Sequence, residues 1–308
     1  MRVFLTGGTG MIGVRLVRRL RQRGDEVVAL SRRADAWTRV GQDCRVIVGD
    51  PTRAGAWQDD AAGCDAVINL AGLNIFQKRW NDAVKAELLS SRVESTHRVV
   101  EALAKSPTRR DGSPKPLVNA SAVGYYGPHG DEELTEDSPP GDDTLARVCV
   151  EWEAAARGAE ASGARVTMIR TGVVLDSEGG ALKPLLLPFT MGVGGPVGSG
   201  KQYWSWIHHV DEVGIILLAL DHSEARGPIN ATAPTPATSK EFAKAFGAAL
   251  GRPAFLPTPA FALRLLLGEV SEVIAKGQRV LPKRALELGY QFQYAEAGTA
   301  LREIFGGR

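Results

Sequence analysis

The sequence predicts an α/β protein built on a doubly wound parallel sheet, with a smaller α+β part toward the C-terminus. Three observations lead to this prediction. Short apolar runs alternate with longer segments of 3.6-residue periodicity through the first half of the 308 residues, a glycine-rich turn follows the first apolar run, and the sequence changes character after residue 172. Such alternation is typical of βαβ units on a parallel sheet.

The elements of the first half follow from this alternation. Short apolar runs predict strands at 2–6, 26–30, 45–48, 66–70, 116–121 and 165–170. Helical periodicity predicts helices at 11–23, 81–105 and 143–162. The intervening stretches 106–115 and 127–142 are rich in proline, glycine and charge, so we expect exposed loops there.

The second half does not continue the repeat. Glycines and prolines throughout 179–206 predict a loop-rich lid or pocket wall, and Ser239 is the expected N-cap of a helix at 241–250. A second apolar helix is expected in the stretch ending at residue 268. We therefore predict a nucleotide-binding domain at 1–175, to which 210–232 returns, and a substrate-side domain made of 176–209 and 233–308.

Composition excludes several classes of partner. The formal net charge is +2 and charges of both signs are interspersed, so no single-sign field favours nucleic acid or an acidic membrane. The densest apolar run, 215–220, is far shorter than the ~18 residues of a membrane helix. Three cysteines without metal-ligand spacing, Cys44, Cys64 and Cys149, predict neither a disulfide framework nor a metal site, and favour the cytoplasm.

The stretch "VFLTGGTGMIGVRL" carries the first functional signal. Gly7, Gly10 and Gly13 stand between a strand and a helix, where a tight turn, a bare backbone and the helix N-terminus together bind pyrophosphate. The spacing G-x-x-G-x-x-G is that of short-chain dehydrogenases. The alternative is a glycine-rich turn without a ligand. The predicted dinucleotide seat comprises Gly7, Thr9, Gly10, Met11, Ile12 and Gly13.

The end of the second strand indicates which dinucleotide is bound. An NAD site needs a carboxylate there for the ribose 2′-hydroxyl, whereas a 2′-phosphate needs arginine and small hydroxyl donors. Ser31, Arg32 and Arg33 occupy this position, and no acid occurs before Asp35. We therefore predict NADP(H); the alternative is a pair of surface arginines.

Other strand ends fit the same ligand. Asp50 follows the third strand, where it is expected to accept from the adenine amine, and small residues follow the fourth. The end of the sixth strand is expected to meet the cofactor or the substrate. The additional cofactor-binding candidates are Asp50, Leu70, Ala71, Gly72, Ser121, Arg170, Thr171 and Gly172.

Together these residues resemble a known family. "FLTGGTGMIG", "INLAGLNI", "SRVEST", "ASAVGYYG", "CVEWEAAA", "RTGVVL", "GGPVGSGKQYWSWIHHVDEV" and "GQRVLPKRALELGYQF" span most of the chain. The sequence is similar to atypical extended short-chain dehydrogenases/reductases, in particular to an epimerase-like subfamily with a C-terminal domain of unassigned function. The resemblance implies a Rossmann domain, a smaller domain over the nicotinamide end and NADP(H) binding, but it supplies no substrate.

The usual catalytic pair is missing. Short-chain dehydrogenases use Tyr-x-x-x-Lys, in which the lysine lowers the pKa of the phenol so that it exchanges protons near neutral pH. No tyrosine of this chain has a lysine four residues later. Alignment on Glu153 places Leu145 and Cys149 at the two positions. The usual hydroxyl survives as Ser121.

The remaining candidates each have a structural alternative. Tyr125 or Tyr126 could bring a phenol to the nicotinamide end, and His208 or His209 could act as a general base or make structural hydrogen bonds. Cys149 is a buried hydrophobe or a nucleophile, and the aromatic residues at 203–206 pack between domains or stack on a substrate. Our catalytic candidates are Ser121, Tyr125 and His208.

Two functions remain open. The first is an NADP(H)-dependent, epimerase-like oxidoreductase that holds a small polar substrate between Ser121, Tyr125, the sixth strand end and the 180–209 lid. The second is a catalytically silent NADP(H)-binding module with a regulatory, partner-binding role, because relatives in the resembled subfamily have been labelled as cell-division regulators. In related folds, helices such as 81–105 and 143–162 form a dimer interface, which suggests a homodimer.

Overall fold

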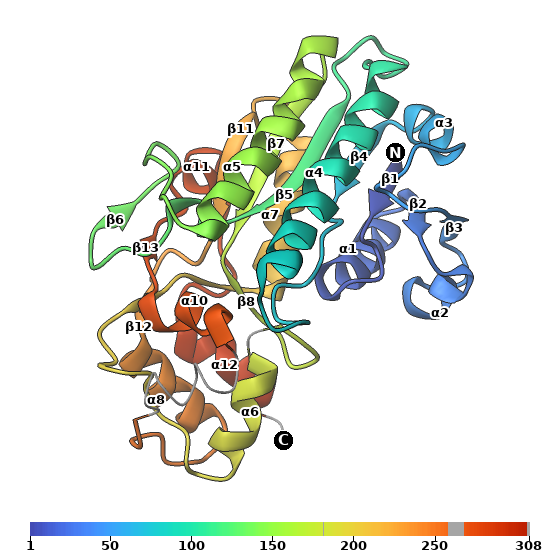
Figure 1. The fold of residues 1–308 in the computed structure, drawn as a ribbon. Coiled ribbons are helices and arrows are strands. Elements are labelled where there is room, and N and C mark those ends of the chain that lie inside the picture. Colours follow the sequence, from blue (N-terminus) through green and yellow to red (C-terminus); the bar gives the residue numbers. More distant parts are fainter. Residues whose placement is uncertain (181, 258–267, 307–308) are drawn as a thin grey trace.

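A seven-stranded parallel sheet forms the centre of the computed structural model, which describes residues 1–180, 182–257 and 268–306 (Figure 1). The first six of these strands fall where the sequence predicts them. The seventh lies within 210–232, the segment expected to return to this domain. The strands are β1 (Arg2–Thr6), β2 (Glu26–Ser31), β3 (Arg45–Val48), β4 (Ala66–Asn69), β5 (Pro116–Ala122), β7 (Arg165–Thr171) and β11 (Gly227–Ala231).

The strand order makes one edge of the sheet the natural place for a ligand. The order is β3-β2-β1-β4-β5-β7-β11. The chain adds β2 and β3 on one side of β1, and then β4, β5, β7 and β11 on the other side. Thr6 pairs in register with both Leu30 and Asn69. Because the strands are parallel, their carboxyl ends meet beside this reversal, where ligands bind in open α/β sheets.

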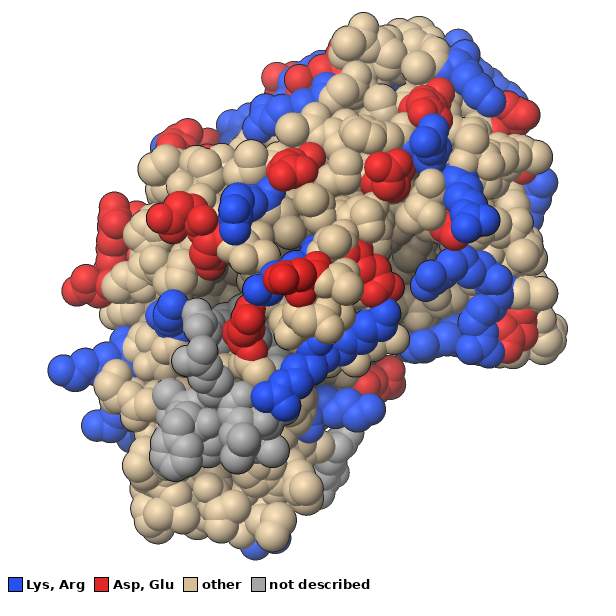
Figure 2. Space-filling model, viewed as in Figure 1, with Lys and Arg blue, Asp and Glu red and all other residues tan. Residues whose placement is uncertain are grey.

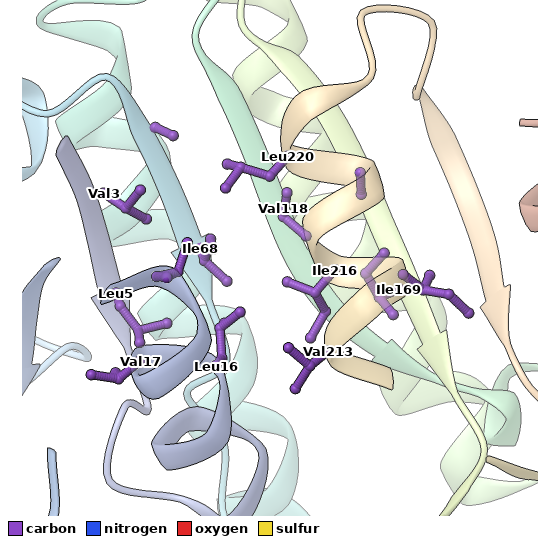
Figure 3. Packing of buried hydrophobic residues seen from close by; sticks show 14 of the residues in the cluster. Val3, Leu5, Leu16, Val17, Ile68, Val118, Ile169, Val213, Ile216 and Leu220 are labelled. Atoms are coloured by element: carbon purple, nitrogen blue, oxygen red, sulfur yellow. The ribbon is translucent and has the colours of Figure 1, made fainter. Parts of the chain in front are cut away.

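Helices cover both faces of the sheet. One face carries α1 (Met11–Gln22) and α7 (His209–Asp221); the other carries α3 (Trp57–Ala62), α4 (Asp82–Ala104) and α5 (Thr144–Arg157) (Figure 1). Figure 3 shows side chains of α1 and α7 packed on the sheet, among them Leu16, Val17, Val213, Ile216 and Leu220. The predicted helix 143–162 changes at Gly158 to a 3₁₀ turn that ends at Ser162.

Buried polar groups connect the strand ends. The Thr6 hydroxyl donates to Asn69 Oδ1 (2.6 Å), and Asn69 Nδ2 donates to Asn119 Oδ1 (2.7 Å) and to the hydroxyl of Thr96 on α4 (2.9 Å). All four residues have no exposed surface. Since a buried polar group is costly without a partner, this chain of bonds fixes β1, β4 and β5 in register at the ligand edge.

A second core lies beyond this edge. It gathers α6 (Leu182–Thr190), α8 (Ser239–Ala249) and α12 (Ala297–Phe305), with Phe246 between Phe189 and Phe305 at centroid distances of 4.6 and 5.2 Å. The N-cap of α8 is Thr238, so the prediction of Ser239 was wrong. Thr238 and Glu241 form a capping box, whereas the Ser239 hydroxyl accepts from the Val197 amide (3.0 Å).

Two-stranded sheets lie beside the central one. They pair β8 (Val173–Leu175) with β10 (Trp206–His208), β9 (Tyr203–Trp204) with β12 (Ala237–Thr238), and β6 (Glu133–Leu134) with β13 (Arg279–Val280). The loop 127–142 is therefore not simply exposed, because Leu134 is buried at 2% exposure. The sheet of β8 and β10 has residues in both cores. The other α-helices in the described residues are α2 (Trp37–Val40), α10 (Ser271–Lys276) and α11 (Lys283–Glu287).

The C-terminal segment 277–281 is partly buried between the cores, with Gly277 and Val280 buried. The Ser205 hydroxyl donates to the Gln278 carbonyl (2.7 Å) and accepts from the Val280 amide (2.9 Å), while Gln278 Nε2 donates to the Val123 carbonyl (2.8 Å). The Leu281 amide donates to Leu134 (2.8 Å). Segments from three parts of the chain therefore meet here.

Some expectations lie partly or wholly outside these findings. The second apolar helix falls mostly on 258–267, outside the described residues, and the domain boundary at 175 stays a prediction.

Cys44, Cys64 and Cys149 are buried free thiols. In the described ranges, no helix combines the length and apolarity needed to cross a bilayer. On the face in Figure 2, basic and acidic residues occur together across the surface.

Candidate active-site cavity

A cavity of about 630 Å³ runs along the carboxyl edge of the sheet to the second core. The glycine loop forms one end, the ends of β4, β5 and β7 form the floor, and α5 forms a wall. Leu185 and Trp204 of the second core close the other side, together with Tyr203 and Gln278. Apolar and aromatic side chains dominate the lining, whereas the sequence led us to expect a pocket for a polar substrate.

The glycine loop leaves no room for side chains. Gly7 has φ of +69°, and a Cβ there would lie 2.5 Å from the Leu70 carbonyl oxygen. A Cβ on Gly13 would overlap the Gly7 carbonyl oxygen. Gly10 caps α1 without a side chain, and the first turn of α1 has no acid. Backbone N–H groups at the helix N-terminus are thus open to an anion, so this part of the structure fits a pyrophosphate.

The candidates for the 2′-phosphate lie outside the cavity lining, at the same sheet edge. Ser31 pairs in register with Val48, two residues before Asp50. Arg33 is bound to Asp35 by Nη2 at 2.6 Å. Arg32 is exposed and, among the described residues, has no carboxylate partner. Arg32 is therefore the arginine that can neutralise a phosphate without breaking an existing pair.

The other predicted cofactor residues divide into two groups. Met11, Ile12, Leu70, Gly72, Ser121, Thr171 and Gly172 line the cavity together with the three glycines, whereas Thr9, Ala71 and Arg170 do not. The Ala71 amide donates to the Thr6 hydroxyl (3.2 Å). Gly172 lies against the Ser205 carbonyl, where no side chain fits.

Arg170 has a structural partner. It is 1% exposed and forms a two-pronged pair with Glu153, with Nε and Nη2 at 2.8 and 2.9 Å from the two carboxylate oxygens. Its Nη1 donates to the Tyr126 hydroxyl (2.9 Å). The Ser121 hydroxyl also donates to Glu153 (2.8 Å). The charge of Arg170 is thus neutralised by Glu153, and the hydroxyl proton of Ser121 is already donated to the same carboxylate.

The three catalytic candidates are not brought together. Ser121 lines the cavity, but Tyr125 and His208 do not. The Tyr125 ring packs under Arg170, whose Cζ lies 3.5 Å from the ring centroid. His208 caps α7 by accepting from the Val210 amide at Nδ1, and its Nε2 lies 3.0 Å from Glu303. Burial and the neighbouring His209 lower the pKa of His208 to about 4, so the ring is neutral at pH 7.

The positions of the missing Tyr/Lys pair do lie at the site. Leu145 and Cys149 both line the cavity, with Val148 and Trp152 of the same helix. Burial raises the pKa of the Cys149 thiol to about 12, so it stays protonated and non-nucleophilic at neutral pH. An apolar wall thus replaces the usual phenol and ammonium.

Sequence reasoning missed the charged residues of the described lining, which are Arg92, Asp143, Glu212, Glu269 and Lys276. Of these, Arg92 lies in "SRVEST" and Glu212 in "HVDEV", which were noted only as family motifs. Glu212 is 1% exposed; its Oε1 accepts from the Thr171 hydroxyl (2.8 Å), and its buried Oε2 has no partner in the described structure. Burial raises the pKa of Glu212 to about 8, so this carboxyl holds a proton at pH 7.

Replacing Glu212 by Gln is expected to remove a pH dependence of stability. With a folded pKa near 8, Glu212 keeps a proton that the unfolded chain releases above its ordinary pKa of about 4.3, so its contribution to stability is lost as pH rises between these values. The difference in unfolding free energy between the Gln variant and the parent should therefore shift by a few kcal/mol in favour of the variant from pH 5 to 8.5. Urea unfolding at several pH values measures it.

The exposed Glu151→Gln variant is the control and should show a constant difference across this range. A Glu212→Gln profile parallel to that of the parent would show that Glu212 titrates normally. The comparison is made without any ligand, so it reports on the carboxyl alone.

Comparisons with known proteins extend these observations. Residues 3–231 match the NAD dependent epimerase/dehydratase family, and residues 258–304 match a domain of unknown function, DUF1731. The epimerase family protein SDR39U1 of Bos taurus is 42% identical over 309 residues, covering 99% of each chain. A chloroplastic SDR39U1 homologue of Arabidopsis thaliana is 44% identical over 307 residues, covering 99% of this chain and 86% of its own.

A solved structure agrees with the fold over its whole length. The crystal structure of human SDR39U1 with NADPH superposes with a TM-score of 0.86 at 40% identity and covers all of both chains. The resemblance found in the sequence motifs and the Rossmann-type sheet are both confirmed. This chain belongs to the NAD dependent epimerase/dehydratase family.

Proposed function

We propose that this protein is an NADP(H)-dependent oxidoreductase of the epimerase-like type, acting on a small molecule bound in the cavity. The observation that carries the proposal is the continuity of that cavity. It runs from a glycine loop shaped for pyrophosphate to a wall of aromatic side chains beyond the strand ends. The human relative solved with NADPH supports the choice of cofactor.

The residues have distinct roles in this proposal. Gly7, Gly10 and Gly13 admit the pyrophosphate, and Arg32 takes the 2′-phosphate. NADPH supplies a hydride when it is bound. Thr171 lines the cavity and donates to Glu212, whose carboxyl holds a proton, so this pair is better placed to exchange a proton with a substrate than Tyr125 or His208.

Replacing Arg32 by Asp is expected to reverse the cofactor preference. The parent should bind NADPH more tightly than NADH, because a free guanidinium forms charge-assisted bonds with the 2′-phosphate. In the variant a carboxylate repels that phosphate, so NADPH affinity should fall by at least about 100-fold while NADH affinity is kept or improved. Calorimetric titration of both proteins with each nucleotide measures this.

Arg18→Asp, an exposed change of the same charge on α1, is the control and should leave the preference intact. If Arg18→Asp and Arg32→Asp lose the same NADPH affinity, the loss comes from the changed net charge and not from a contact of Arg32 with the 2′-phosphate. If the parent binds neither nucleotide, the oxidoreductase proposal fails.

A second function is favoured by one specific observation. The usual acid and cation are replaced by Leu145 and Cys149 in the cavity wall, as in a protein that binds NADPH without turning it over. In that case the bound nucleotide would serve a regulatory, partner-binding role. Oxidation of bound NADPH on addition of carbonyl substrates distinguishes the two, since a silent module binds but never oxidises it.

Location and assembly form part of the same proposal. Three buried free thiols favour a reducing compartment such as the cytoplasm, although the plant relative is chloroplastic. The adjacent helices α4 and α5 lie on one outer face of the sheet, where a homodimer interface is expected. Light scattering of the purified protein determines the assembly state.

A further inference from the structure

A guanidinium in the cavity wall is held by neutral groups alone. Arg92, on α4, donates from Nη1 to the Leu88 carbonyl and from Nη2 to the Leu73 carbonyl, both at 2.9 Å. Its Cζ lies 5.0 Å from the centroid of the Trp152 ring. These contacts fix the position of the side chain and leave its positive charge unneutralised.

The acids that line the same cavity are engaged elsewhere. Asp143 accepts from the Ala146 amide at the start of α5 (2.8 Å), and Glu269 pairs with Lys85 (2.5 Å). Glu212 bonds to Thr171. In the described part of the chain, no carboxylate forms an ion pair with Arg92. Burial accordingly lowers the pKa of Arg92, as expected of a cation that lacks a counter-ion.

The surroundings of Arg92 are apolar. Leu73, Leu88, Cys149 and Trp152 line the cavity around it, and Ile75, Phe76 and Trp80 continue this wall. Gly72 makes room for the guanidinium, because a Cβ at that position would lie 3.3 Å from Cζ of Arg92. Lys276 also lines the cavity, so Arg92 is one of two cations in the lining that the structure describes. A fixed guanidinium in an apolar stretch of wall is a typical means of orienting a small ligand.

We propose that Arg92 binds the carboxylate of a small substrate whose remaining body is apolar. The inference rests on the proposed function and adds the chemical class of its substrate. A planar guanidinium pairs with a carboxylate through charge-assisted bonds, and a bound anion would supply the charge that Arg92 lacks. The body of the ligand would lie against the leucines and aromatic rings of α4 and α5. A nucleotide sugar, being polar throughout, matches this wall poorly.

The test uses 3-phenylpropionate, 4-phenylbutyrate and hexanoate, each beside its uncharged amide, titrated calorimetrically into the full chain with and without saturating NADPH. We expect at least one carboxylate to bind about tenfold more tightly than its amide, which corresponds to about 1.4 kcal/mol. Arg92→Gln should abolish that difference without changing the affinity for the amide or for NADPH.

Two further variants complete the design. Arg98→Gln, on the same helix but paired with Glu101 at the surface, should behave as the parent. Arg92→Lys keeps the positive charge but loses the planar guanidinium, so its preference for a carboxylate over the amide should be several-fold smaller than that of the parent. If Arg92→Gln does not fold, this variant tests the proposal in its place.

Several results would overturn the proposal. The first is that the parent shows no preference for any carboxylate over its amide, and the second is that the preference persists in Arg92→Gln. The third is a loss of NADPH affinity in Arg92→Gln, which would assign Arg92 to the cofactor. The fourth is binding of UDP-glucose that depends on Arg92. If NADPH does not bind the parent, the proposed function fails, while the titrations without NADPH still test Arg92.

Discussion

Replacing Arg170 by Met is expected to lower the unfolding free energy by about 3–5 kcal/mol, because it leaves the Glu153 carboxylate buried without its cation. Side-chain exposures of 2% and 3% leave water no access to the pair. The change also removes the bond to the Tyr126 hydroxyl, which in turn donates to Asn230 on β11 (2.6 Å). Urea unfolding, with the slope compared as well as the midpoint, measures the loss.

Two variants show whether this loss of stability comes from the unpaired charge or from lost packing. Arg45→Met breaks an exposed pair with Asp60, at 52% and 27% side-chain exposure, and should cost less than about 1 kcal/mol. Adding Glu153→Gln to Arg170→Met should recover part of the stability, because no uncompensated charge then remains. If the double variant is as unstable as the sum of both single changes, the damage comes from lost packing instead.

Replacing Gly13 by Val is expected to abolish NADPH binding and to cost about 1–3 kcal/mol of stability or more. Every side chain at this position overlaps the Gly7 carbonyl oxygen, so α1 must move away from β1. That movement carries the open N–H groups of the first turn away from the pyrophosphate. Calorimetric titration with NADPH and urea unfolding report the two effects separately.

Gly130→Ala provides the matched control. A Cβ at Gly130 has nothing within 4 Å, and its backbone does not need a glycine conformation. This variant should bind NADPH as the parent does. Retention of NADPH binding in Gly13→Val would mean that α1 does not hold the cofactor in the manner proposed.

The fold was largely predictable, since its signals are local. Alternating apolar runs place β1 to β5 and β7, and the glycines between β1 and α1 identify the ligand edge before any tertiary contact is known. β11 was not among the predicted strands. Its sequence, with Gly227, Pro228 and Asn230, is a poor strand pattern, and it is held by pairing with β7.

The site was less predictable, because its chemistry depends on contacts across the chain. The role of Arg170 depends on Glu153, 17 residues earlier, and on Tyr126, 44 residues earlier. The raised pKa of Glu212 comes from burial between elements, which a single sequence does not report. Arg92 differs from Arg98, the surface arginine of α4, in facing Trp152 and the cavity. Residue type was visible in the sequence, whereas environment was not.

The segment 277–281 has a consequence for biosynthesis. β13 pairs with β6, whose residues leave the ribosome nearly 150 positions earlier, and the same segment fills the space between Val123 and Tyr203. The sheet can form as its strands emerge, but the cavity wall contributed by Gly277 and Gln278 exists only after the residues that follow β11 have been synthesised. A nascent chain therefore exposes the apolar edge of its future binding cavity until segment 277–281 has been synthesised and packs against β6.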